Sequence, residues 1–130
     1  AGDMALREAA RRMQNSIRPY DAVGRYGGEE FMVVLPGCDR ESTSNQAERM
    51  RAAIYGEPVE MPDGPVQLSA SFGCSTFSGS GPVSAEMLIR TADEALYKAK
   101  GSGRNCTVFQ SYMHVAGAPF AESDLRSRAC

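Results

Sequence analysis

The chain has 130 residues, a length that suits one compact domain. Hydrophobic residues make up 42% of it and the formal charge is −2, which excludes a disordered chain and argues against non-specific nucleic-acid binding. Four cysteines lie far apart with one histidine, so we expect free thiols, no structural zinc site and a cytoplasmic location. The longest apolar run, residues 31–36, is far too short to cross a bilayer.

The sequence opens within a helical pattern. Apolar residues follow one helix face from Leu6 to Ile17, and Asp3 is a good N-cap for that helix. Pro19 should end the helix near Arg18, because the residue before a proline avoids helical geometry. With no leading strand and no start methionine, the chain is expected to be a fragment of a longer domain or protein.

A β-hairpin is predicted next, with strands at residues 22–26 and 30–35. The Gly27-Gly28 pair between them is a two-residue turn signal, because such turns need positive φ. The second strand is apolar on both faces, which is typical of a strand inside a sheet that helices cover.

The rest of the chain alternates helices and strands. The expected elements are a helix, a turn, a strand with one buried face, a flexible loop, a helix capped by Ser84, and a short strand (residues 42–55, 62–64, 66–72, 78–82, 84–101 and 106–109). This order indicates an α/β or α+β domain over residues 1–110, followed by a tail, residues 111–130, in which the pattern fades.

Two adjacent carboxylates, Glu29 and Glu30, stand at the lip of the second hairpin strand. They repel each other, so a cation, basic partners or exposure to solvent should compensate. A glycine turn lets a bulky anion approach the backbone, and a carboxylate beside it can hold Mg²⁺. On these four residues alone, a solvated turn with two surface glutamates is the favoured interpretation.

Four segments in order resemble motifs of one family, the GGDEF domains of diguanylate cyclases. The hairpin "RYGGEEF" resembles the family's signature, in its GGEEF variant, and the "RPYD" before it stands where the family carries an RxxD inhibitory site. The segment "ADEALYKAKGSGRN" resembles the last helix and its phosphate-contacting end, and the opening "AGD" resembles the end of a GHxxGD segment. Such a set is far more specific than one motif.

The resemblance implies a palm-like nucleotidyl-cyclase fold, with a central, mostly antiparallel sheet flanked by helices. Family members condense two GTP into cyclic di-GMP (c-di-GMP) and two pyrophosphates, using Mg²⁺ or Mn²⁺, and they act as homodimers that hold one GTP per subunit. It also implies a covalently linked sensor or receiver domain in a larger bacterial signalling protein. Neither nucleic acid nor a membrane is an expected partner of this domain.

The resemblance assigns the catalytic and metal roles to the hairpin. Glu29 would be the metal ligand, and Glu30 would support the site beside it. Gly27 and Gly28 would allow close approach of the triphosphate and ribose.

The same resemblance assigns the remaining GTP contacts to the two ends of the chain. Asp3 would contact guanine, because a carboxylate can accept hydrogen bonds from the N–H groups of the base. Lys100 and Arg104 would contact the phosphates. Without the resemblance, Lys100 and Lys98 would be favourable charges at a helix C-terminus.

Product inhibition by c-di-GMP is implied at Arg18 and Asp21, with Arg49 as a further arginine of that site. Arginine can donate two hydrogen bonds to guanine O6 and N7. The alternative for Arg18 and Asp21 is an exposed i, i+3 ion pair that contributes little to stability.

The family's N-terminal helix and first strand, with an aspartate that shares the metals, have no counterpart in this sequence. Glu29 alone is a poor Mg²⁺ cage, and the hairpin strand should keep an unpaired edge. The polypeptide is therefore expected to be catalytically deficient unless that segment exists in the real molecule. Three functions stay open: a diguanylate cyclase, a c-di-GMP receptor and, least favoured, a structural dimerisation domain.

Overall fold

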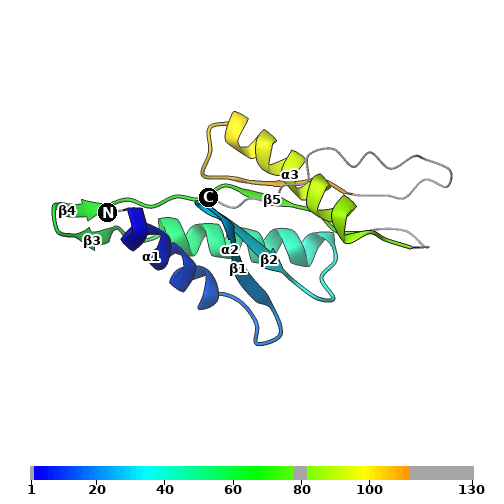
Figure 1. The fold of residues 1–130 in the computed structure, drawn as a ribbon, viewed down its shortest axis with the longest axis horizontal. Coiled ribbons are helices and arrows are strands. Elements are labelled where there is room, and N and C mark those ends of the chain that lie inside the picture. The colour runs from blue at the N-terminus through cyan, green and yellow to red at the C-terminus, as the bar shows by residue number, and fades with distance from the viewer. Residues whose placement is uncertain (1, 78–81, 112–130) are drawn as a thin grey trace.

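The structure, a computed structural model, describes residues 2–77 and 82–111, so the expected loop at 78–82 and the tail lie almost entirely outside the described residues. The fold mixes helices and strands, which confirms the predicted class. Its elements in chain order are α1 (Gly2–Gln14), β1 (Ala22–Gly27), β2 (Glu30–Val34), α2 (Arg40–Tyr55), β3 (Val59–Met61), β4 (Gly64–Val66), β5 (Phe72–Cys74), α3 (Ala85–Gly101) and β6 (Thr107–Phe109). In Figure 1, β5 lies between α2 and α3. The β1–β2 hairpin packs beside α1 through β1.

Within the described residues the strands form three two-stranded ladders. The pairs β1–β2 and β3–β4 are antiparallel, and β5–β6 is parallel. No described strand joins β2 to β5, so the one central sheet that the sequence predicted is divided, and β2 keeps an unpaired edge as expected. The prediction that β2 lies inside a sheet is therefore wrong for the described part of the chain, and Val34 near its end is 52% exposed.

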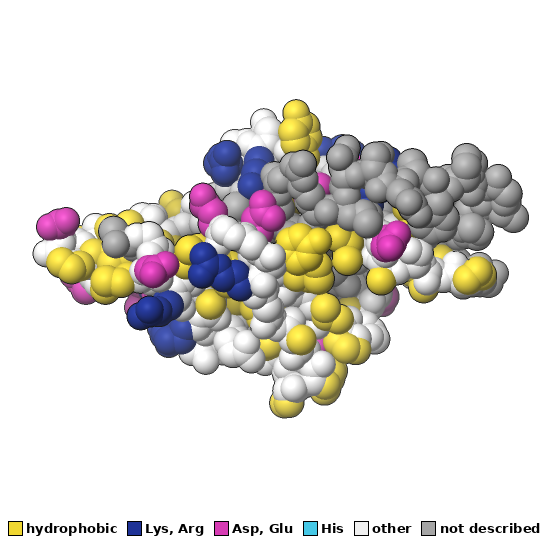
Figure 2. Space-filling model, in the orientation of Figure 1, with side chains coloured by type: hydrophobic (Ala, Val, Ile, Leu, Met, Phe, Trp, Pro, Cys, Tyr) yellow, Lys and Arg dark blue, Asp and Glu magenta, His cyan; other side chains and the backbone are white. Residues whose placement is uncertain are grey.

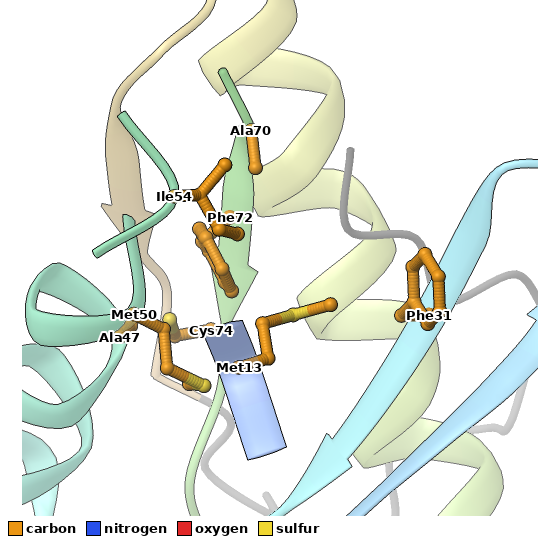
Figure 3. Packing of buried hydrophobic residues seen from close by; sticks show 8 residues of the cluster. All are labelled: Met13, Phe31, Ala47, Met50, Ile54, Ala70, Phe72 and Cys74. Atoms are coloured by element: carbon orange, nitrogen blue, oxygen red, sulfur yellow. The ribbon is translucent and has the colours of Figure 1, made fainter. Parts of the chain in front are cut away.

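The core gathers side chains from α1, α2, β2, β5 and the segment before β5. Figure 3 shows its eight buried members: Met13, Phe31, Ala47, Met50, Ile54, Ala70, Phe72 and Cys74. The helix α3 covers β5 from the other side, with Ala95, Leu96 and Ala99 buried. Gly73 lets the two elements approach closely, since a Cβ there would overlap the Ala92 carbonyl and the Leu96 backbone.

The first helix differs from its prediction at both ends. It begins at Gly2, so Asp3 lies in its first turn and is not its N-cap. It ends at Gln14, four residues before Arg18, because the Ser16 N–H donates to the Met13 carbonyl and tightens the chain into a turn. A carboxylate in a first turn is still favourable there, since the helix N-terminus carries partial positive charge.

The predicted strand at 66–72 is wrong. Val66 ends β4, Phe72 begins β5, and the segment between them belongs to no ladder. The alternation in the sequence records burial instead of strand pairing, because Leu68, Ala70 and Phe72 all pack on the core. The expected turn at 62–64 becomes the connection of the β3–β4 hairpin, with Met61 opposite Gly64.

The later helices agree with the sequence. Tyr55 ends α2 as expected, and the Asp39 carboxylate caps its start by accepting from the Ser42 N–H. Ser84 caps α3 as predicted, accepting from the Met87 N–H. None of the helices in the described residues is long and apolar enough to span a membrane.

Candidate functional site

The turn of the β1–β2 hairpin is one residue later than predicted. Gly27 pairs with Glu30 across the ladder, so Gly28 and Glu29 form the turn. Gly28 has a φ of 52°, a conformation that glycine adopts without strain. A Cβ on Gly27 or Gly28 would meet nothing within 4 Å, so the backbone of the turn is open to an approaching ligand.

The two glutamates are separated by their places in the hairpin. Glu29 is exposed in the turn, whereas Glu30 is half-buried as the first residue of β2. Arg25 steadies the turn from β1, since its Nε donates to the Gly28 carbonyl at 2.8 Å. Exposure to solvent is thus what relieves the charge of Glu29, one of the three compensations that the sequence left open.

Glu29 and Glu30 are the candidate ligands for a divalent cation at the hairpin. In residues 2–77 and 82–111, no three His, Cys, Asp or Glu side chains form a group that could hold a metal. Mg²⁺, however, commonly keeps several waters and binds through one or two carboxylates together with substrate phosphates. The exposed carboxylate of Glu29 fits that kind of shared metal and not a closed protein cage.

A hollow of about 310 Å³ lies between α1 and β1, and we call it the hairpin hollow. Its lining combines polar or charged side chains (Asp3, Arg7, Gln14 and Arg25) with an apolar floor (Leu6, Ala10, Val23 and Phe31) and Gly24. The structure therefore brings Asp3 to the strand that carries the hairpin. An apolar floor with a few polar groups suits a flat heterocycle.

Sequence reasoning missed Arg7, Gln14 and Arg25 as lining residues of this hollow. Spacing could have found two of them, because Asp3, Arg7 and Gln14 recur at positions that share one helix face. Arg25 could be placed only once β1 was known to pack beside α1.

The proposed phosphate contacts lie at the end of α3. Lys100 is half-buried in the last turn, and Arg104 is exposed beyond it with a φ of 63°. Neither lines the hairpin hollow, and neither is hydrogen-bonded to Glu29 in the described structure. Figure 2 shows basic side chains over the C-terminal end of α3 and acidic side chains over the hairpin tip, on the same face.

Arg18 and Asp21 form a hydrogen-bonded ion pair in the turn before β1, and we call it the Arg18–Asp21 corner. Arg18 donates from Nε to Asp21 Oδ2 at 2.8 Å and from Nη2 to Oδ1 at 2.6 Å, and its backbone N–H donates to Oδ2 at 2.9 Å. The Asp21 side chain is fully buried, while 34% of the Arg18 side chain is exposed. The hydrogen bonds from Arg18 hold the pKa of Asp21 below its usual value. The alternative of an exposed, weak ion pair therefore does not describe this corner.

The environment of Arg18 contains residues that sequence reasoning missed. Its Nη2 also donates to the Pro36 carbonyl and to Cys38 Sγ, both at 3.1 Å, and its Cζ lies 4.5 Å from the centre of the Tyr20 ring. Arg49 is exposed on α2, and in the described residues none of the hydrogen-bond partners of Arg18 is shared with Arg49. The three described cysteines (Cys38, Cys74 and Cys106) are free thiols, as expected.

Comparison with known proteins adds to this geometry. The profile of the family described as "Diguanylate cyclase, GGDEF domain" matches residues 1–106. The response regulator PleD of Caulobacter vibrioides is 40% identical over 109 residues, which cover 82% of this chain and 24% of PleD. Diguanylate cyclase DosC of Escherichia coli is 39% identical over 105 residues, covering 80% of this chain and 22% of DosC. The chain thus spans about a quarter of the length of these relatives.

Solved structures share the fold. Diguanylate cyclase SiaD of Pseudomonas aeruginosa, solved in complex with its activator SiaC, matches with a TM-score of 0.75 and 33% identity over 83% of this chain and 41% of SiaD. The active GGEEF domain of a diguanylate cyclase from Vibrio cholerae matches with a TM-score of 0.73 and 31% identity over 82% of this chain and 67% of that one.

Proposed function

Because the chain belongs to the GGDEF family of diguanylate cyclases, we propose that it binds GTP at the β1–β2 hairpin and forms c-di-GMP as one half of a homodimer. The observation that carries this proposal is the hairpin itself. Its turn offers the open backbone of Gly28 and the exposed carboxylate of Glu29 beside a hollow that Asp3 lines. A receptor would have no need for such a carboxylate.

Each residue of the site has a proposed part in holding the nucleotide. Asp3 accepts hydrogen bonds from guanine N–H groups in the hairpin hollow. Gly27 and Gly28 leave room for the ribose and triphosphate, because no side chain covers their backbone. Lys100 and Arg104 neutralise phosphate charge from the end of α3.

Glu29 is proposed to hold Mg²⁺ or Mn²⁺, with Glu30 supporting the site from β2. When bound, the metal supplies Lewis-acid stabilisation of charge on the phosphoryl oxygens. Glu29 is exposed at the tip of the hairpin, so its carboxylate would be accessible to a metal ion that enters with the nucleotide.

The reaction requires two copies of the chain. The ribose 3′-hydroxyl of one GTP attacks the α-phosphate of the other and gives its proton to a base, for which Glu29 is the proposed group. An O–P bond forms while the bond between the α- and β-phosphates breaks and pyrophosphate leaves. Repeating the step in the opposite sense closes the ring and releases the second pyrophosphate. Because each subunit holds one GTP, two hairpins must face each other across the dimer.

The Arg18–Asp21 corner is the proposed site of product inhibition, with Arg49 as a further contact. Asp21 is buried and already accepts three hydrogen bonds from Arg18, so the exposed part of Arg18 is the surface available to guanine. Tyr20 adds an aromatic face beside it. We propose that this domain is linked to a sensor or receiver domain, because its relatives are several times longer than the chain. A cytoplasmic location is proposed with it, since the described cysteines are free thiols.

A second candidate, a c-di-GMP receptor without turnover, is favoured by one observation. The described residues do not assemble three metal-ligating side chains at the hairpin. In this case Arg18 would still bind c-di-GMP, and GTP would not be converted.

Incubation with GTP and Mg²⁺, followed by chromatography and mass detection of c-di-GMP, separates the two candidates. The matched variants are Glu29→Gln and, as control, Glu60→Gln, which changes an exposed glutamate of the β3–β4 hairpin. Product that Glu29→Gln abolishes and Glu60→Gln spares supports the cyclase. Absence of product from folded protein that binds c-di-GMP, with binding lost in Arg18→Ala, supports the receptor. Unchanged turnover in Glu29→Gln would refute the metal assignment.

A further inference from the structure

The loop after α3 has an unusual backbone. Gly103, Arg104 and Asn105 have φ values of 103°, 63° and 47°, so three consecutive residues are in the left-handed half of the map. Glycine adopts this region freely and asparagine tolerates it, but arginine seldom does. Such a run persists only when surrounding contacts hold it.

The Arg104 N–H donates to the Ala99 carbonyl at 3.1 Å, and Asn105 ties the loop to elements beyond α3. Its backbone N–H donates to Ser71 Oγ at 3.2 Å, and Ser71 is buried in front of β5. Its side-chain Oδ1 accepts from Arg51 Nη1 at 2.9 Å. Because Arg51 is on α2, the loop that carries Arg104 is fixed to a helix more than fifty residues earlier in the chain.

Arg51 is itself held in place. Its Nε donates to both carboxylate oxygens of Glu48 at 2.9 Å, and Glu48 Oε2 also accepts from Thr107 Oγ1 at 3.2 Å. Thr107 begins β6, so α2 is linked to the chain on both sides of Cys106. The Arg51 side chain is 19% exposed, and its planar guanidinium donates hydrogen bonds to Glu48 and Asn105 at the same time.

A similar pair elsewhere shows what is particular to Arg51. Arg11 makes the same i, i+3 pair with Glu8 on α1, but its side chain is 62% exposed and its hydrogen bonds are to Glu8 alone in the described structure. Glu8 also pairs with Arg12, which donates to the Ile54 and Glu57 carbonyls, but Arg11 itself contacts no other element in this way. The pair on α2 extends through Asn105 to the loop of the proposed phosphate contacts.

We propose that Arg51 is a positioning residue for the triphosphate: it fixes Asn105, and through it the loop that presents Arg104, without touching the nucleotide. This inference rests on the proposed function and adds to it a residue of α2 that none of the four motifs contains. Loss of Arg51 should leave guanine recognition in the hairpin hollow unchanged. It should weaken only the part of the affinity that the β- and γ-phosphates supply.

The test compares the affinities of GTP and GMP, both with Mg²⁺, by titration calorimetry. Arg51→Ala should lower the GTP-to-GMP affinity ratio roughly 10-fold or more, with GMP affinity unchanged. Arg11→Ala, the matched control, should leave the ratio as it is. Arg104→Ala is the reference that must lower the ratio if the loop contacts phosphate.

Asn105→Gly provides a second route that does not depend on how well Arg51→Ala folds. Glycine accepts the observed backbone conformation but removes the acceptor for Arg51. This variant should lower the ratio by itself, and adding Arg51→Ala to it should cause no further loss, because both act through one hydrogen bond.

The outcomes distinguish this inference from the proposed function. If wild-type protein fails to bind GTP, or Arg104→Ala leaves the ratio unchanged, the proposed phosphate contacts are overturned, and this inference with them. If Arg104→Ala lowers the ratio but Arg51→Ala lowers GTP and GMP affinity equally, or its effect adds to that of Asn105→Gly, only the role of Arg51 is overturned.

Discussion

The β1–β2 hairpin and the β5–α3 interface both contain a glycine at their centre, but the surroundings of the two glycines are opposite. A Cβ on Gly28 would meet nothing within 4 Å. A Cβ on Gly73 would overlap the Ala92 carbonyl and the backbone of Leu96. Gly28 leaves space for something outside the chain, whereas Gly73 lets one element of the chain pack against another.

The two regions also differ in how much of their surface is exposed to solvent. The hairpin keeps Glu29 in solvent and carries few core residues, Phe31 being the buried one of β2. The interface buries Cys74 and Leu96 and exposes little. We therefore expect changes in the hairpin to alter ligand binding at small cost in stability, and changes in the interface to alter stability first.

The largest expected effect is on stability, at Gly73. Gly73→Ala should lower the free energy of unfolding by about 3 kcal/mol or more, because backbone atoms cannot move aside as a flexible side chain can. Gly28→Ala, its matched partner, should cost about 1 kcal/mol, the strain of a non-glycine residue at positive φ. Urea unfolding followed by circular dichroism measures both. Equal losses would remove the contrast between the regions.

The next effect is on ligand binding, at Glu29. Glu29→Ala should change the free energy of unfolding by less than about 0.5 kcal/mol, since an exposed turn carboxylate has no packing to lose. Its GTP affinity in Mg²⁺ should fall to that of wild-type protein in EDTA, and any turnover should fall at least about 100-fold. Calorimetry with and without Mg²⁺ decides the point. A metal-dependent gain that survives in the variant would show that Glu29 is no ligand.

The next effect concerns the free energy of unfolding and comes from the ion pair between Arg18 and Asp21 instead of from a packed glycine. Because Arg18 holds the pKa of Asp21 down in the folded state, the unfolded chain takes up the proton first as the pH falls. The stabilisation is therefore complete above about pH 4 and is lost as the pH falls through the lowered pKa.

Unfolding measured from pH 6 to pH 2.5 tests this linkage. Asp21→Asn should be less stable than wild type at pH 6, and the difference should shrink toward acid. The control is Asp63→Asn, which changes an exposed carboxylate in the turn between β3 and β4 and should follow wild type throughout. A constant difference across this range would show that the ion pair does not couple to folding.

The sequence predicted local features well and long-range ones poorly. The hairpin strands were placed to within a residue because apolar content and glycines encode them locally. The turn was misplaced by one residue because the ladder shifts register between Arg25 and Gly27, which no periodicity reveals. The false strand at 66–72 arose because alternation reports a buried face, and an unpaired extended segment has the same alternation as a strand.

The candidate site shows the same division. The motifs identified Glu29 and Arg18, but the burial of Asp21 depends on the chain near Cys38 folding back over the corner. The role proposed for Arg51 depends likewise on Asn105, which is fifty-four positions away. Sequence spacing gives no measure of contacts of that kind, because they form only when the helices pack.

The smallest expected effect is the reaction rate of the Cys74 thiol, which lies at the β5–α3 interface. Burial raises the pKa of the Cys74 thiol to about 12, so almost none is thiolate at pH 8. Cys38 is half-buried and should react with a thiol reagent far sooner.

In Gly73→Ala the interface should open more often and Cys74 should react faster, whereas Gly28→Ala should leave the reaction rate of Cys74 unchanged. Peptide mass mapping after timed alkylation follows each thiol separately. Rapid labelling of Cys74 in wild-type protein would mean that β5 and α3 separate readily, so that Gly73 is not at the centre of a tightly packed interface.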